Sequence, residues 1–123
     1  MSKHILIVDD SDTCRKVTRL FLESQLGLEV CGEAVDGVGA IEKARALKPD
    51  LVDIDLTMPR MNGAEATSEL RAMMPRVLIV LFTLYDDVVG RALALSAGAN
   101  LVVSKPDDGW KPIECVQSLL EAA

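Results

Sequence analysis

The chain has 123 residues, about the size of one average domain, and half of them are hydrophobic. This composition provides a sizeable core and excludes a disordered chain. With 13 basic and 19 acidic side chains the net charge is −6. Direct nucleic-acid binding is therefore not expected, because phosphate neutralisation needs clustered Lys and Arg. No apolar run approaches the ~20 residues that span a bilayer, and residues 1–4 lead directly into a strand-like run, so we expect neither a membrane segment nor a signal peptide.

The three cysteines, Cys14, Cys31 and Cys115, are widely spaced and form no CxxC pair. This pattern is typical of reduced, mostly buried thiols in a cytoplasmic protein. The single histidine, His4, stands at the start of the first predicted strand and is expected to be solvated. These residues therefore predict a cytoplasmic location and no zinc site.

In chain order, short apolar runs alternate with segments of helical spacing. Residues 5–8 form a β-branched run, typical of a strand covered on both faces. The following helix, capped by Ser11 or Asp12 and ended by Gly27, carries one apolar face. That face is predicted to contain Cys14, Val17, Leu20 or Phe21, and Ser24. Residues 28–33 predict a half-exposed strand. A second helix follows Asp36 and Gly37, carries Ala40, Ile41, Ala44 and Leu47, and is stopped by Pro49.

Three further strand–helix pairs complete the pattern. The strands are predicted at 51–54, 77–82 and 101–103. The helices are one bearing Ala66, Leu70 and Met73, one opened by Asp86 and closed by Gly98, and a last one over 112–120. Five such units with short loops predict one α/β domain, residues 1–123, in which helices cover both faces of a parallel sheet.

Polar residues follow four of the five predicted strands. The first strand ends in Asp9 and Asp10, the third in Asp55, the fourth in Thr83 and the fifth in Lys105. Ligands bind a doubly wound sheet at the carboxyl ends of its strands. The fold is therefore expected to bring three carboxylates, one hydroxyl and one ammonium group to one edge.

Three carboxylates this close cannot all remain ionised without a counter-charge. An all-oxygen site with room for water suits Mg²⁺. The set also meets the needs of phosphoryl transfer to an aspartate, since Lys105 and a metal neutralise the transferred oxygens and the Thr83 hydroxyl bonds one of them. Each residue alone has an ordinary structural explanation, such as an acidic pair at a helix N-terminus. The combination at four strand ends favours a phosphoryl-transfer site.

At these residues the chain resembles, over essentially its whole length, the receiver domain of two-component response regulators. The motifs that carry the resemblance are ILIVDDS at 5–11, PDLVDIDLTMPRMNG at 49–63, Thr83 and SKP at 104–106. The resemblance implies a flavodoxin-like sheet of five strands in the order 2-1-3-4-5, with five helices. Residues 82–87 look most like receivers whose full-length proteins carry a C-terminal helix-turn-helix. This sequence contains no such module, which fits either a stand-alone receiver or a fragment.

By that resemblance, Asp55 is the expected phosphoacceptor. Mg²⁺ would be bound directly by Asp10 and through water by Asp9, with Asp55 and the backbone carbonyl of Thr57 as the other protein ligands. Thr83 would follow the phosphoryl group and Lys105 would hold it. The donor would be a histidine kinase or a histidine phosphotransfer protein, so the chain is expected to be a signalling switch and not an enzyme.

Phosphorylation is expected to bias the face formed by the fourth helix, fifth strand and fifth helix, as a shift between two populated states. An output domain, a downstream protein or a second copy of the chain would bind there. The candidate contact residues are Leu93, Leu95, Trp110 and Ile113.

Three positions depart from the family pattern. Val102 replaces the aromatic residue that rotates inward on activation, and Leu84 stands where a small residue is common. Asp53 lies on the same side of its strand as the phosphoacceptor, where an apolar residue is normal, and a buried carboxylate needs a partner or a proton. Thr57 and Tyr85 occupy the positions that tune the lifetime of the phosphoryl group.

Two other functions compete with the switch. Residues 53–57 also fit the DxDxT motif of haloacid-dehalogenase-type phosphohydrolases, with Asp53 as nucleophile and Asp55 as general acid. Those enzymes place the motif on their first strand, which leaves Asp9 and Asp10 without a role here. The second competitor is a receiver-fold module that binds a partner without phosphorylation, which the three departures favour.

Overall fold

The computed structural model describes residues 3–25, 27–56, 62–83 and 88–104. Its elements, in chain order, are β1 (Lys3–Val8), α1 (Asp12–Glu23), β2 (Leu28–Ala34), α2 (Gly37–Leu47), β3 (Leu51–Asp55), α3 (Gly63–Met73), β4 (Leu78–Thr83), α4 (Val88–Ala97) and β5 (Leu101–Ser104). These elements confirm the predicted alternation of strands and helices. The predicted last helix, residues 112–120, lies outside the described residues.

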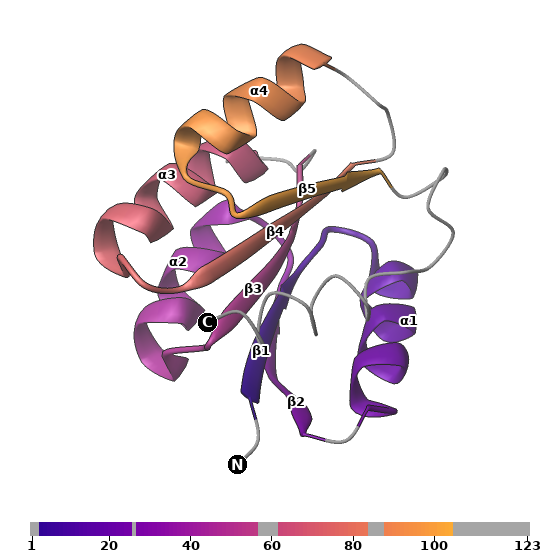
Figure 1. Ribbon diagram of the computed structural model, residues 1–123. Helices are drawn as coiled ribbons and strands as arrows, with labels where there is room; N and C mark the ends of the chain where they lie inside the picture. The colour runs from indigo at the N-terminus through magenta and orange to yellow at the C-terminus, as the bar shows by residue number, and fades with distance from the viewer. Residues whose placement is uncertain (1–2, 26, 57–61, 84–87, 105–123) are drawn as a thin grey trace.

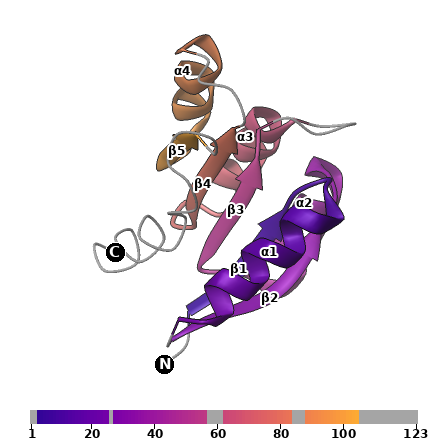
Figure 2. The same cartoon turned by 90° about the vertical axis from the view of Figure 1, so that its right-hand side faces the viewer.

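The five strands form one parallel sheet in the order β2-β1-β3-β4-β5. Helix α1 covers one face of the sheet, and α2, α3 and α4 cover the other (Figures 1 and 2). The architecture and the strand order implied by the resemblance are both confirmed. None of the helices in the described part of the chain is long and apolar enough to cross a membrane.

Two apolar clusters, one on each face, hold the helices to the sheet. On the side of α2, α3 and α4, the cluster includes Ala40, Ala44, Ala66, Leu70 and Ala94 together with Val52, Ile54, Ile79, Leu81 and Val102. On the side of α1, Leu22 packs with strand residues that include Ile5, Ile7, Leu51, Val80 and Phe82. Because successive strand side chains alternate between faces, both faces of β3 are buried. This explains why every residue of β3 other than its two aspartates is apolar.

Helix α1 presents a different face to the sheet from the one its apolar spacing predicts. Thr18 and Leu22 are its buried residues, whereas Leu20 is 72% and Phe21 38% exposed and Val17 is half-buried. The prediction was wrong for Leu20 and Phe21, because the face that packs on the sheet is the one that carries Thr18 and Leu22. Two arginines on the same helix, Arg15 and Arg19, also bind Glu33 of β2.

Candidate functional site

The acidic residues predicted to share a site lie together at the carboxyl edge of the sheet. Asp9 directly follows β1, and Asp55 is the last residue of β3. These two strands are neighbours, with Val8 paired to Ile54, so Asp9 and Asp55 end their strands at the same height. Carboxylate oxygens of Asp9, Asp10 and Asp55 lie within 4.8 Å of one another.

The three carboxylates differ in exposure. Asp9 is 6% and Asp55 9% exposed, whereas Asp10 is exposed to solvent. Like charges this close repel one another strongly where water is partly excluded. Their oxygen donors and the open side at Asp10 fit a hard divalent cation that keeps part of its water shell, such as Mg²⁺. The three carboxylates of the expected donor set therefore lie together.

The backbone around Asp9 is held on several sides. Its N–H donates to the Ala34 carbonyl of β2 at 3.1 Å. Its Oδ1 accepts a hydrogen bond of 2.9 Å from the Ser11 N–H. Ser11 is also the N-cap of α1, with its side chain accepting from the Cys14 N–H at 3.2 Å. The turn from β1 into α1 therefore fixes the first carboxylate of the cluster.

The remaining predicted site residues divide at the edge of the described chain. Thr83 is the last residue of β4, and its backbone pairs with Ser104 at the end of β5. Its position at the carboxyl edge is thus as predicted, and Lys105 directly follows β5 in the sequence. Lys105 itself and Thr57 lie outside the described residues, as do Leu84 and Tyr85.

Gly63 allows helix α3 to begin directly behind Asp55. A Cβ atom at Gly63 would lie 2.5 Å from the Asp55 carbonyl oxygen and 2.7 Å from Leu81 Cδ2. The Gly63 N–H donates to the Leu56 carbonyl at 2.9 Å, and Asn62 caps α3 through the Glu65 N–H. The absence of a side chain at residue 63 therefore lets the end of β3 and the start of α3 approach closely.

Asp53 is buried, as its place on β3 predicts. It is 6% exposed and pairs in register with Ile7 of β1 and Val80 of β4. The residue takes part in an interaction within the chain, although its Oδ2 atom is buried and accepts no hydrogen bond from a described residue. Like Asp55, it lies on the α1 side of the sheet, because Val52 and Ile54 point to the opposite cluster.

Sequence reasoning missed the basic residues next to this cluster. Arg15 donates from Nη1 to the Asp9 carbonyl at 2.7 Å and from Nε to Glu33 at 3.1 Å. Asp12, which is exposed, has a pKa below its usual value because of a hydrogen bond and charge from Lys16, with a smaller contribution from Arg15. A basic residue one turn after a helix cap was the available signal, but many exposed helices carry one.

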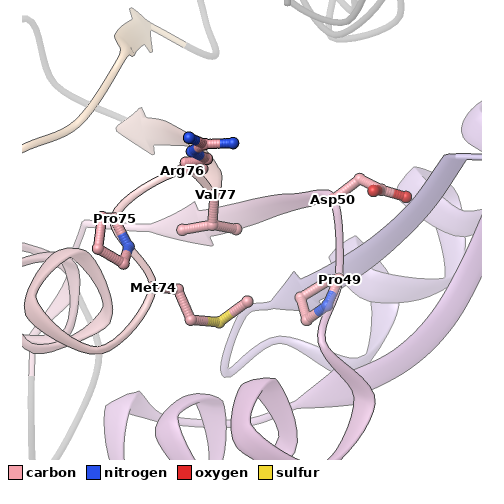
Figure 3. A pocket seen from close by; sticks show the side chains of 6 residues that line it. All are labelled: Pro49, Asp50, Met74, Pro75, Arg76 and Val77. Carbon is pink, nitrogen blue, oxygen red and sulfur yellow. The ribbon is translucent and has the colours of Figure 1, made fainter.

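A cavity of about 460 Å³ lies at the other end of the sheet. It is lined by Pro49, Asp50, Met74, Pro75, Arg76 and Val77, which precede β3 and β4 (Figure 3). The Asp50 carboxylate points away from this space and accepts a hydrogen bond from the His4 N–H at 2.7 Å. The cavity and the acidic cluster are therefore separated by the length of a strand.

A doubly wound sheet that gathers carboxylates at its carboxyl edge is typical of phosphoryl-accepting signalling domains. The family model described as the response regulator receiver domain matches residues 5–114. The chain belongs to this family and is a receiver domain of two-component response regulators. Receiver domains act as signalling switches, and phosphorylation and Mg²⁺ binding in an acidic pocket are typical of them. Residues 53–57, which also fit the phosphohydrolase motif, lie within the range that the receiver-domain model matches.

Several curated relatives cover most of the chain. Chemotaxis protein CheY of Thermotoga maritima is 36% identical over 97% of this chain and 96% of its own length. Response regulator protein VraR of Staphylococcus epidermidis is 41% identical over 98% of this chain, which spans 58% of VraR. A protein-glutamate methylesterase/protein-glutamine glutaminase of Myxococcus xanthus is 42% identical over 83% of this chain, which spans 29% of that protein. The chain thus matches nearly all of one relative and one part of the others.

Solved structures show the same fold. A LuxR-family two-component response regulator from Aurantimonas superimposes with a TM-score of 0.93 at 30% identity, covering 99% of this chain and 87% of that one. The receiver domain of the putative response regulator NarL from Mycobacterium tuberculosis gives a TM-score of 0.87 at 26% identity, covering 98% and 95%. These neighbours confirm the expected resemblance to response regulator receivers, one of them from a LuxR-family regulator.

Proposed function

We propose that this chain is a cytoplasmic, Mg²⁺-dependent phosphoacceptor switch in which Asp55 receives a phosphoryl group from a phosphohistidine. The observation that carries the proposal is the cluster of Asp9, Asp10 and Asp55 oxygens within 4.8 Å at one edge of the sheet. A cluster of like charges is costly to hold together, and a bound cation compensates for that cost. The donor would be a histidine kinase or a histidine phosphotransfer protein, as family membership supports.

The proposed reaction is a displacement at phosphorus. An Asp55 carboxylate oxygen attacks, a phosphorus–oxygen bond forms, the phosphorus–nitrogen bond breaks, and the donor imidazole leaves with the bonding electron pair. When bound, Mg²⁺ supplies positive charge that offsets the repulsion between the carboxylates and the phosphoryl oxygens. In this proposal Asp10 would bind the metal directly and Asp9 through water, with Asp55 and the Thr57 carbonyl as the other protein ligands.

Two further side chains are proposed to hold the transferred group. The Lys105 ammonium would neutralise a phosphoryl oxygen, and the Thr83 hydroxyl would donate a hydrogen bond to another. The pairing of Thr83 with Ser104, which precedes Lys105 in the sequence, supports this arrangement. Thr57 and Tyr85 are proposed to flank the path of the hydrolytic water. A dephosphorylation rate of Tyr85→Ala equal to that of the unaltered chain would remove this last role.

Intact-mass spectrometry after incubation with acetyl phosphate and MgCl₂ tests the proposed function. The expected result is a single labile phosphoryl adduct that is lost with EDTA and in Asp55→Asn. Asp53→Asn is the matched control, because it changes a buried aspartate of the same strand on the same face, and it should retain the adduct.

Two results would contradict the proposal. An adduct that persists in Asp55→Asn and disappears in Asp53→Asn would make Asp53 the acceptor. Failure of acetyl phosphate, phosphoramidate and a phosphorylated histidine kinase to modify the folded chain would favour an interaction module that works without phosphorylation.

The surface of α4 supports an output role. Val88, Leu93 and Leu95 are 78%, 60% and 47% exposed, and Arg91 is the one charged residue between Val88 and Ala97. We propose that an output domain, a downstream protein or a second copy binds this surface together with β5 and the segment that follows it. Phosphorylation should raise the apparent mass in light scattering or strengthen partner capture, and Leu93→Glu should remove that response while Asp55 remains phosphorylated.

The proposed switch works without a rotating aromatic side chain in β5. Val102 stands at that position and is only 4% exposed, packed in the cluster on the side of α2, α3 and α4. Trp110 and Ile113, the other predicted contact residues, lie outside the described chain.

A further inference from the structure

One arginine links the turn that carries the acidic pair to two neighbouring elements. Arg15 lies in the first turns of α1, and its side chain is only 12% exposed. Its guanidinium donates from Nη1 to the Asp9 carbonyl at 2.7 Å, from Nη2 to Asp12 at 3.0 Å and from Nε to Glu33 of β2 at 3.1 Å. Three different donors of one planar group therefore bind three different partners.

The bond to the Asp9 carbonyl acts on both residues of the acidic pair. That carbonyl belongs to the peptide unit that joins Asp9 to Asp10, and a peptide unit is planar. Fixing its oxygen fixes the plane of the unit, and with it the direction in which the chain reaches Asp10. The N–H and the Oδ1 of Asp9 are already bound by Ala34 and Ser11, so the Arg15 bond completes the support of this turn.

We propose that Arg15, held in place by Glu33, is a positioning residue for the divalent cation of the acidic cluster. This inference rests on the proposed function, because it assigns a support to the same site. Groups that orient metal ligands typically change metal affinity 10- to 100-fold when they are removed. A lysine cannot replace this arginine, because its single ammonium group lacks the planar fork of donors that reaches Asp9 and Glu33 together.

Arg19 provides a matched control on the same helix. It binds the other oxygen of Glu33 at 2.8 Å and Glu23 at 2.7 Å, one helical turn farther from the acidic cluster. Both arginines therefore tie α1 to β2, but Arg15 also holds the Asp9 peptide. A loss of helix docking would affect both variants, whereas a loss of ligand positioning would affect Arg15 alone.

The loss of charge and the loss of support at Arg15 should change the affinity for the cation in opposite directions. Removing a positive charge beside three carboxylates should strengthen cation binding if charge alone matters. Removing the support of the Asp9 peptide should weaken it. Arg15→Met tests the sign, and Arg15→Lys keeps the charge while it removes the fork.

The experiment is calorimetric titration of the whole chain with MgCl₂ for the unaltered chain, Arg15→Lys, Arg15→Met and Arg19→Lys. We expect Mg²⁺ dissociation constants about tenfold higher for both Arg15 variants and changed by less than twofold for Arg19→Lys. In phosphorylation by acetyl phosphate, Arg15→Lys should need correspondingly more Mg²⁺ for half-maximal rate and reach the same rate at saturation. Far-ultraviolet circular dichroism verifies that each variant is folded. If Arg15→Met unfolds, the comparison of Arg15→Lys with Arg19→Lys decides the test.

The outcomes separate this inference from the function on which it rests. Mg²⁺ binding by Arg15→Lys equal to that of the unaltered chain would overturn the positioning role and leave the phosphoacceptor function in place. Equal weakening in Arg15→Lys and Arg19→Lys would also overturn it, since helix docking would then explain both. An unaltered chain that binds no Mg²⁺ and accepts no phosphoryl group would overturn the proposed function and this inference together.

Discussion

The two ends of the parallel sheet differ in how their charged and polar groups are arranged. At the carboxyl ends of the strands, Asp9, Asp10 and Asp55 hold like charges within 4.8 Å. At the amino ends, one guanidinium compensates many acceptors. Arg71 of α3 donates to the Gly98 carbonyl at 2.9 and 3.1 Å, to the Val77 carbonyl at 2.6 Å, and to the Asn100 side chain at 2.8 Å.

The end around Arg71 joins three elements through one connected set of hydrogen bonds. The Asn100 Oδ1 atom that accepts from Arg71 also accepts from the Ile79 N–H at 2.8 Å. The last turn of α3, the start of β4 and the turn between α4 and β5 are thereby held together. The amino end is thus held by hydrogen bonds between neighbouring elements, whereas the carboxyl end gathers three carboxylates whose oxygens suit a hard divalent cation.

The largest effect on stability is expected from Arg71→Met, which keeps an apolar stem and removes every donor. Several carbonyl groups would lose their partners, each at a cost of about 1 kcal/mol or more, so the free energy of unfolding should fall by about 3 kcal/mol. Urea denaturation measures this change. Arg76→Met, an exposed arginine at the same end of the sheet, should change the stability by less than about 0.5 kcal/mol. Equal losses in both variants would show that the hydrogen bonds of Arg71 are not the cause.

Gly63→Ala is the corresponding test at the carboxyl end. The new methyl group would overlap the Asp55 carbonyl and Leu81, so we expect a loss of about 2 kcal/mol and a slower phosphorylation of Asp55. In Gly32→Ala, the new methyl group would overlap the flexible end of Leu47, at 2.7 Å from its Cδ1 atom, and would meet Leu6 and Lys43 at ordinary contact distances; Leu47 is 40% exposed. That variant should be nearly neutral in urea denaturation, and a normal phosphorylation rate in Gly63→Ala would contradict the close packing behind Asp55.

Asp10→Asn should raise the free energy of unfolding, whereas Arg71→Met should lower it. Removing one of three clustered charges relieves repulsion, so without Mg²⁺ the free energy of unfolding should rise by about 1 kcal/mol. The gain in melting temperature that MgCl₂ gives the unaltered chain should be lost or much reduced. Thermal unfolding with and without MgCl₂ measures both changes. A loss of stability in Asp10→Asn without metal would contradict the electrostatic contrast between the two ends.

The smallest effect is expected midway along β2, away from both ends. Burial raises the pKa of the Cys31 thiol. The thiol donates a hydrogen bond to the Ile5 carbonyl oxygen, with 3.5 Å between Sγ and oxygen. A raised pKa in the folded state contributes stability that is complete below the unfolded pKa of about 8.5 and is lost as pH rises through the folded pKa. The stability of the unaltered chain should therefore fall more steeply above about pH 8.5 than that of Cys31→Ala. Urea denaturation at a series of pH values measures both slopes. Equal slopes for the unaltered chain and Cys31→Ala would contradict a contribution from Cys31.

Much of the candidate site was predictable because it depends on strand ends. Apolar runs mark the strands, and parallel strands bring the residues after them to one edge. This placed Asp9, Asp10 and Asp55 together without any knowledge of their contacts. The burial of Asp53 followed in the same way from the alternation of side chains along β3. The roles of Thr57 and Lys105 remain predictions, because those residues lie outside the described chain.

The sequence by itself determined the alternation of strands and helices, the parallel sheet and the acidic edge, since these follow from periodicity and local order along the chain. Only the tertiary structure decided which face of α1 is buried and which partners Arg15 and Arg71 bind. Arg15 and Glu33 are 18 residues apart, and Arg71 and Gly98 are 27 apart. Among many possible charged and polar partners, only the packing of helices on the sheet selects these pairs, because a hydrogen bond requires a distance and an angle that no local pattern specifies.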